Sequence, residues 1–172
     1  MAPIVAAVLL AIERVAYVWV WRRPQSFRAL CDTISLGEPV VALERLFYGF
    51  KALQILVFAG WCYVFGDGTI WSPNRGALPI ASGMALIAVG QVLNLGVFYR
   101  LGATGVFYGN RFGHELDWCR KFPFSLLDHP QYVGAVLSIW GFFLAMRFPH
   151  PDWLFLPALE TAYYALGAWF EQ

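Results

Sequence analysis

Residues 77–99 read ALPIASGMALIAVGQVLNLGVFY and contain no charged side chain. A helix needs about 20 apolar residues to cross the hydrocarbon core of a bilayer, so this stretch is long enough to do so. Working outward from it, we find apolar stretches at about 3–21, 45–65, 77–99, 131–148 and 153–170. These runs are too continuous for barrel strands, and an open sheet leaves unsatisfied edges in lipid. The sequence therefore predicts an all-α integral membrane protein, a bundle of about five transmembrane helices.

The composition supports this class of protein. The chain has 172 residues, of which 59% are hydrophobic and 13% are charged, whereas soluble domains carry about 25% charged residues. A soluble enzyme and a disordered chain are therefore disfavoured, and the net charge of +1 argues against a nucleic-acid partner. The length fits one transmembrane domain, residues 1–172. Glu13 and Arg14 interrupt the first stretch, so an interfacial position is the alternative for that helix.

Lys and Arg side chains concentrate in the connectors that follow the first and third stretches: Arg22, Arg23, Arg28, Arg111, Arg120 and Lys121. By the positive-inside rule both connectors face the cytoplasm, and with five spans the C-terminus lies on that side too. We expect the endoplasmic reticulum membrane in a eukaryote or the cytoplasmic membrane in a bacterium, with the active site facing the cytoplasm.

The connector at about 100–130 gathers two of the three histidines together with several acids and bases, and chemistry is expected there. Its last part, FPFSLLDHPQYVG (122–134), opens the fourth helix, with Pro130 in the first turn and Asp128 as the predicted N-cap. Such a helix start suits a carboxylate or a phosphate. Gly134 leaves space beside the helix for a ligand. The alternative is an ordinary capped interfacial helix.

Small and polar residues mark two other predicted helices. Gly83, Gly90 and Asn94 lie in one narrow band of the third helix, where they favour close approach of a ligand or, alternatively, of another helix. Glu160 and Glu171 share one face of the last helix. An acid within a span indicates function, but a structural partner for Glu160 is an equal alternative. Glu171 lies at the cytoplasmic end and is better placed for chemistry, although it could be a solvated terminal acid.

The histidines do not predict a metal centre. His114 and His129 lie 15 residues apart, and the chain contains neither HxxxH nor HExxH spacing. We therefore expect no metal.

Three sequence features together resemble one family. GVFYGNRFG (105–113), FPFSLLDHPQYVG (122–134) and the terminal Glu171 resemble the phosphatidylethanolamine N-methyltransferase family of phospholipid methyltransferases. Residues 6–30 resemble the first hydrophobic segment of that family and the basic run after it. The HPxYxG element is also similar to that of isoprenylcysteine carboxyl methyltransferases and, more remotely, of membrane sterol reductases.

The resemblance implies S-adenosylmethionine as the cosubstrate. In the family, a GxG motif in the third hydrophobic segment and a Glu-Glu pair after the last helix are associated with its binding. The matching positions here are Ala88-Val89-Gly90 and Glu171-Gln172. Ala88 and Gln172 depart from the family pattern, and loss of the second carboxylate would weaken contact with the amino group of the cosubstrate.

We hypothesise that the cosubstrate lies between the third, fourth and fifth helices. Its predicted contacts are Ala88, Val89, Gly90, His129, Tyr132, Gly134, Glu171 and Gln172. The predicted contacts of the lipid amine are Tyr108, Asn110 and Asp128, and Asp128 or His129 would accept its proton. Arg111 or Arg120 would bind the lipid phosphate.

The predicted function is stepwise N-methylation of phosphatidylethanolamine, or of its mono- and dimethyl derivatives, toward phosphatidylcholine. The partners are then a phospholipid substrate and the bilayer, while the oligomeric state is unknown. Carboxyl methylation of a prenylated cysteine is the nearest alternative. Sterol reduction would need a nicotinamide site, for which no additional basic segment is found, and a scaffold that only packs helices is the non-enzymatic alternative.

Overall fold

The computed structural model describes residues 1–71, 76–117 and 119–171, and every regular element within them is helical. Along the chain these are α1 (Ala2–Arg22), α2 (Pro24–Thr33), α3 (Pro39–Val64), α4 (Ala77–Val106), η1 (Gly109–Phe112), α5 (Pro130–Met146), η2 (Pro151–Leu154) and α6 (Phe155–Phe170). The prediction of an all-α fold is confirmed.

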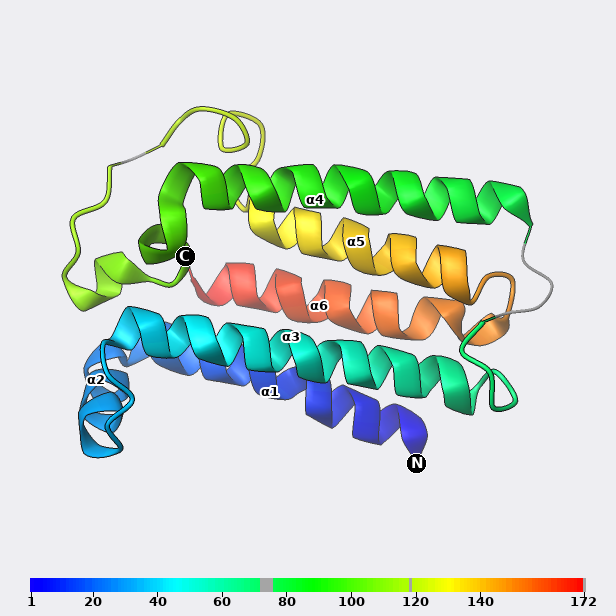
Figure 1. Ribbon diagram of the computed structural model, residues 1–172, viewed down its shortest axis with the longest axis horizontal. Helices are drawn as coiled ribbons and strands as arrows, with labels where there is room; N and C mark the ends of the chain where they lie inside the picture. Colours follow the sequence, from blue (N-terminus) through cyan, green and yellow to red (C-terminus); the bar gives the residue numbers. More distant parts are fainter. Residues whose placement is uncertain (72–75, 118, 172) are drawn as a thin grey trace.

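Helices α1, α3, α4, α5 and α6, which are longer than α2, lie side by side along the long axis of the molecule (Figure 1). Helix α4 packs on α5, α5 on α6, and α1 on both α6 and α3. Helix α2, the connector after α4 and the C-terminal end of α6 lie at one end of the bundle, and the N-terminus lies at the other (Figure 1). The two basic connectors and the C-terminus therefore share one end, as the charge pattern predicts.

Several helix bounds differ from the expected ones. Helix α1 runs unbroken through Glu13 and Arg14, and α3 begins at Pro39 instead of near residue 45. Helix α2 was not predicted from the sequence. It is short and amphipathic, and it buries Phe27 and Cys31, so it lacks the continuous apolar run by which the other helices were located.

Two segments are long and apolar enough to cross a membrane: Ala2–Arg22 and the 36-residue segment Ala77–Phe112. Helix α5 is apolar but has only 17 residues, and α6 has 16. Helix α3 has 26 residues but contains Glu44, Arg45 and Lys51. The number of five spans is thus not confirmed.

Glycines bring the backbones of α4 and α5 together. A Cβ on Gly90 would lie 2.4 Å from the carbonyl oxygen of Gly134, and a Cβ on Gly83 would lie 2.5 Å from that of Gly141. The prediction that Gly134 leaves space for a ligand is therefore wrong, because α4 occupies that space. Helix packing, the alternative considered for the small residues of α4, explains Gly83 and Gly90.

Another glycine interrupts α4 before its C-terminal end. Gly102 has a φ of 62° and breaks the helix, a backbone conformation that glycine adopts without steric cost. The chain turns at this end (Figure 1), and Tyr108, which has a left-handed backbone conformation, then leads into η1. This turn brings the first residues of the connector back over the end of the bundle.

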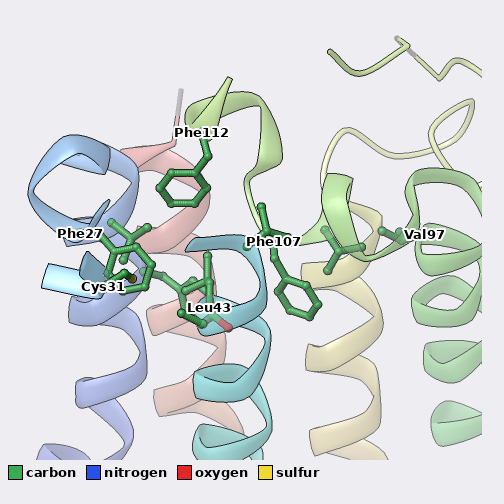
Figure 2. Packing of buried hydrophobic residues seen from close by; sticks show 11 residues of the cluster. Phe27, Cys31, Leu43, Val97, Phe107 and Phe112 are labelled. Atoms are coloured by element: carbon green, nitrogen blue, oxygen red, sulfur yellow. The ribbon is translucent and has the colours of Figure 1, made fainter. Parts of the chain in front are cut away.

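An apolar cluster holds that turn in place. Figure 2 shows Phe112 directed toward Phe27 of α2, while Phe107 lies lower in the same cluster. The ring centroids of Phe27 and Phe112 are 5.9 Å apart, and Arg28 donates a hydrogen bond of 2.6 Å to the carbonyl oxygen of Phe112. Helix α2 thus fixes the beginning of the connector that contributes Tyr108.

Candidate functional site

The bundle contains a cavity of about 1220 Å³ at the end that carries the connector. Its wall comes from α1, α3, α4, α5, α6 and the connector. Seven of the predicted site residues line it: Tyr108, Asn110, Arg120, Asp128, His129, Tyr132 and Glu171. The fold therefore brings together side chains from the connector, the first turn of α5 and the end of α6.

Two other members of this group bind the Glu171 carboxylate. The hydroxyls of Tyr108 and Tyr132 each donate a hydrogen bond of 2.5 Å to its Oε1 atom. The His129 ring stacks on Tyr132, with centroids 5.6 Å apart and an angle of 12° between the planes. Glu171 is thus held in place at the cavity wall instead of being the freely solvated terminal acid that was its alternative.

The start of α5 differs in one detail from the prediction. The N-cap residue is His129, and no side chain caps the helix, so the prediction that Asp128 is the N-cap is wrong. Asp128 is exposed to solvent and lines the cavity beside His129. Its carboxylate is therefore not occupied by capping the helix.

Other predicted residues lie elsewhere. Of the described residues that line the cavity, none is Ala88, Val89, Gly90, Gly134 or Arg111. Ala88 and Val89 are exposed, and Gly90 and Gly134 face each other in the contact between α4 and α5. The Arg111 guanidinium lies over the Trp21 ring, 4.0 Å from its centroid. Gln172 lies outside the described residues.

The cavity reaches the flank of the bundle between α3 and α4. Tyr48 on α3 and Leu95 on α4 both line it and are 58% and 66% exposed. Gln91, on the same side of α4, donates a hydrogen bond of 3.0 Å to the hydroxyl of Ser138 on α5. A molecule could therefore enter from the side as well as from the end.

A buried polar cluster extends the cavity into the bundle, and sequence reasoning largely missed it. Glu13 forms ion pairs with Arg14 and with Lys51, the latter at 3.0 Å between Nζ and Oε1. Lys51 also donates hydrogen bonds of 3.2 Å to the Gln54 amide oxygen and the Tyr164 hydroxyl. Charged residues inside apolar stretches were the available signal, but Glu13 and Arg14 suggested an interfacial helix instead.

Glu160 lies behind this cluster and is 2% exposed. Its carboxylate accepts a hydrogen bond of 2.6 Å from the Gln54 amide. The structure therefore supplies the structural partner that was one of the two alternatives for Glu160.

The fold and the site together define a class: a protein whose described elements are all helical, with two candidate membrane spans and a cavity that opens at one end and on one flank and carries a group of polar side chains in a mainly apolar wall. The family model for phospholipid methyltransferases matches residues 78–172, more than half of the chain. The chain belongs to the phospholipid methyltransferase family.

Curated relatives agree with this assignment. The chain is 34% identical over 124 residues to phosphatidyl-N-methylethanolamine N-methyltransferase of Arabidopsis thaliana. The aligned region covers 72% of this chain and 67% of that protein. The chain is 36% identical over 144 residues to phosphatidylethanolamine N-methyltransferase of Homo sapiens, covering 80% and 69%. For the Rattus norvegicus enzyme of the same name, the identity is 37% over 91 residues, covering 52% and 45%. No solved structure matches the chain.

Proposed function

We propose that this protein transfers methyl groups from S-adenosylmethionine to the amine of phosphatidylethanolamine, of its mono- and dimethyl derivatives, or of both, toward phosphatidylcholine. Family membership and the names of the relatives support this reaction. The observation that carries the site assignment is the Glu171 carboxylate, which Tyr108 and Tyr132 fix at the wall of a large cavity.

The residues around Glu171 fit the methyl donor. A positioned carboxylate suits the donor's amino group or ribose hydroxyls, and the flat stack of His129 on Tyr132 offers an aromatic surface beside it. When bound, S-adenosylmethionine supplies an electrophilic methyl group. In this proposal Glu171, Tyr132 and His129 orient the donor, and the apolar cavity wall excludes water from the reacting atoms.

The lipid amine must lose a proton before it can react. Its pKa resembles that of lysine, about 10 in water, so the amine arrives mostly charged. Asp128 and His129 line the cavity beside each other, and either can accept this proton, directly or through water. Tyr108 and Asn110 would then position the amine. Arg120 is the better candidate for the lipid phosphate, because it lines the cavity, whereas Arg111 lies over the Trp21 ring and is not among the described lining residues.

The position of the protein in the membrane follows from the lengths of the helices and the distribution of Lys and Arg. We propose five spans, α1, α3, α4, α5 and α6, with α2, the connector and the C-terminus on the cytoplasmic side. The lipid then enters between α3 and α4, where Tyr48 and Leu95 are exposed on the flank. The donor enters from the cytoplasmic end, so the two substrates reach the cavity by different routes.

A substrate panel tests the function. Purified protein is incubated with methyl-labelled S-adenosylmethionine and, separately, with phosphatidylethanolamine, its mono- and dimethyl derivatives, and farnesyl-cysteine. We expect label in one or more of the phospholipids. Label in farnesyl-cysteine alone would move the assignment to carboxyl methylation, and label in no product would remove the enzymatic assignment.

Glu171→Gln tests the donor site. The substitution removes the negative charge but keeps an oxygen that Tyr108 and Tyr132 can contact, so we expect the affinity for S-adenosylmethionine to fall at least about tenfold. Isothermal titration calorimetry in detergent measures it. Glu115→Gln, an exposed carboxylate in the connector, is the control and should bind normally. Wild-type affinity in Glu171→Gln would exclude Glu171 from the donor site.

A further inference from the structure

Three buried polar atoms in the cavity wall have no hydrogen-bond partner among the described residues. One, the Oδ1 of Asn94 on α4, is an acceptor, and the other two, the Nε of Arg14 and the hydroxyl of Tyr17, are donors on α1. Arg14 and Tyr17 are each only 9% exposed, and both line the cavity. They are three residues apart on α1 and therefore lie on the same face of that helix. Buried polar groups are nearly always paired, because an unpaired group loses its hydration without compensation. These two donors therefore point to a ligand.

The charges nearby favour an anion. Within the cavity wall, Arg14 and Lys51 share the single carboxylate of Glu13. The other acid of the cluster, Glu160, is bound by Gln54 and is not among the described lining residues. Of the residues that line this part of the wall, two are thus cations and one is a carboxylate. The Glu160 carboxylate also acts on Arg14 and Lys51, but from behind the wall. The surface that a ligand would contact therefore favours a negative group.

The Arg14 side chain is already oriented for such a ligand. Its guanidinium lies over the Tyr164 ring, 4.0 Å from the centroid, while one of its terminal nitrogens contacts Glu13. Lys51 contacts Glu13, Gln54 and Tyr164, so it contributes charge, whereas Arg14 retains a free N–H and Tyr17 a free O–H. Little side-chain ordering remains when an oxyanion binds.

We propose that Arg14 and Tyr17 form an anion subsite in the inner part of the cavity, with Lys51 adding positive charge. The subsite takes an oxyanion: either the carboxylate of the methyl donor or the phosphodiester of the lipid, which present the same chemistry of charged oxygen acceptors. In the second case Arg14 and Tyr17, and not Arg120, bind the lipid phosphate. This inference rests on the proposed function and extends it, because it places one ligand group within the bundle, away from Glu171.

Tyr17→Phe is the sharpest test, since it removes a hydroxyl that has no hydrogen-bond partner in the part of the chain that the structure describes. We expect its thermal midpoint in detergent to match the wild type, while its affinity for one of two probes falls about tenfold. The probes are S-adenosylmethionine, measured by calorimetry without lipid, and dihexanoyl phosphatidylethanolamine, measured by tryptophan fluorescence, since Trp21 lines the cavity. Weaker binding of S-adenosylmethionine would identify the carboxylate of the methyl donor as the bound anion. Weaker binding of dihexanoyl phosphatidylethanolamine would identify the lipid phosphate.

Tyr163→Phe is the matched control. Its hydroxyl donates to the carbonyl oxygen of Ala7, so this variant loses a structural hydrogen bond and should bind both probes like the wild type. Arg14→Lys keeps the charge without the Nε–H and should weaken the same probe as Tyr17→Phe. The subsite proposal would be overturned if Tyr17→Phe bound both probes with wild-type affinity. It would also be overturned if Arg14→Lys weakened only the probe that Tyr17→Phe binds normally.

The two proposals fail separately. If labelled methyl reaches no lipid, the proposed function is wrong, while Tyr17-dependent binding of either probe still supports the subsite. If labelled methyl reaches phospholipid but neither probe depends on Tyr17, the subsite is wrong and the function stands.

Discussion

Asp152 joins three segments at the end of the bundle opposite the cavity mouth. Its carboxylate accepts hydrogen bonds of 3.0 and 2.7 Å from Arg147 and one of 3.0 Å from the Trp61 indole. Arg147 is fully buried and also donates to the carbonyl oxygen of Phe65. Burial by itself would raise the pKa of the Asp152 carboxyl, but the hydrogen bonds from Arg147 and Trp61 outweigh it and hold that pKa below its usual value.

This contact makes stability sensitive to acid. The folded-state pKa of Asp152 lies below the unfolded value of about 3.9, so its contribution is complete above that pH and is lost as the pH falls through the folded-state pKa. Asp152→Asn leaves the buried Arg147 charge unpaired and should lower the unfolding free energy at pH 7 by about 3 kcal/mol. Thermal unfolding in detergent between pH 3 and 7 measures both effects.

The control for this experiment is Asp32→Asn, which removes an exposed carboxylate on α2. It should keep the wild-type midpoint and the wild-type acid sensitivity. The same pH profile for Asp152→Asn and the wild type would contradict the assigned role of Asp152.

Single residues were predictable from the sequence to different degrees. Glu171, Tyr132 and His129, which line the cavity, were predicted as site residues because they stand in motifs that resemble a family or at the polar end of a helix. Arg14, Tyr17 and Lys51 were not, because nothing in the sequence places α1 beside α3 and α6. A charge within an apolar helix is informative only when its partner is known, and the partner is set by packing.

At the scale of the helix pair, the contact between α4 and α5 depends on glycine. A Cβ on Gly134 would lie 2.6 Å from both the Asn94 Oδ1 and the Gly90 carbonyl oxygen. Gly134→Ala should therefore push the helices apart and lower the unfolding free energy by about 1–3 kcal/mol. Because Tyr132 is on the same turn of α5, its contact with Glu171 should also weaken. Thermal unfolding and donor binding measure the two effects.

Gly49 of α3 supplies the comparison, because a Cβ there would meet nothing within 4 Å. Gly49→Ala should keep or slightly raise stability, since alanine has the higher helix propensity. If Gly134→Ala were as stable as Gly49→Ala, the close packing of α4 on α5 would not be required for the fold.

The sequence predicted the helix bounds well where the apolar run was continuous. The expected ranges 77–99 and 131–148 fall close to α4 and α5. Helix α2 and the break at Gly102 were missed, because a short amphipathic helix and a single left-handed glycine leave no long-range pattern. Both features position the connector, so two elements that the sequence did not predict fix the part of the cavity wall that the connector supplies.

At the scale of the whole molecule, cysteine labelling tests the proposed orientation. Cys31 and Cys62 are fully buried, while Cys119 in the connector is half-buried. A membrane-impermeant maleimide should therefore label Cys119 in sealed vesicles whose cytoplasmic face is outward. Cys31 and Cys62 should react only after denaturation.

A reporter at the other end completes that experiment. Thr69 is exposed in the loop after α3, and Thr69→Cys should be labelled only in vesicles of the opposite orientation. Labelling of Cys119 from the non-cytoplasmic face alone would invert the proposed topology, and labelling of both positions from one face would contradict the number of five spans.

The sequence by itself determined that this chain is helical, suited to a membrane, and similar to phospholipid methyltransferases, because apolar run length and local motifs are properties of consecutive residues. Tertiary structure decided which residues form the cavity. In the folded chain Gly90 and Gly134 lie in the contact between α4 and α5, and Tyr108 and Tyr132 contact Glu171. Arg14 and Tyr17 lie in the inner wall of the cavity. These contacts join residues that are far apart in the chain, and only the packing of the helices fixes such distances.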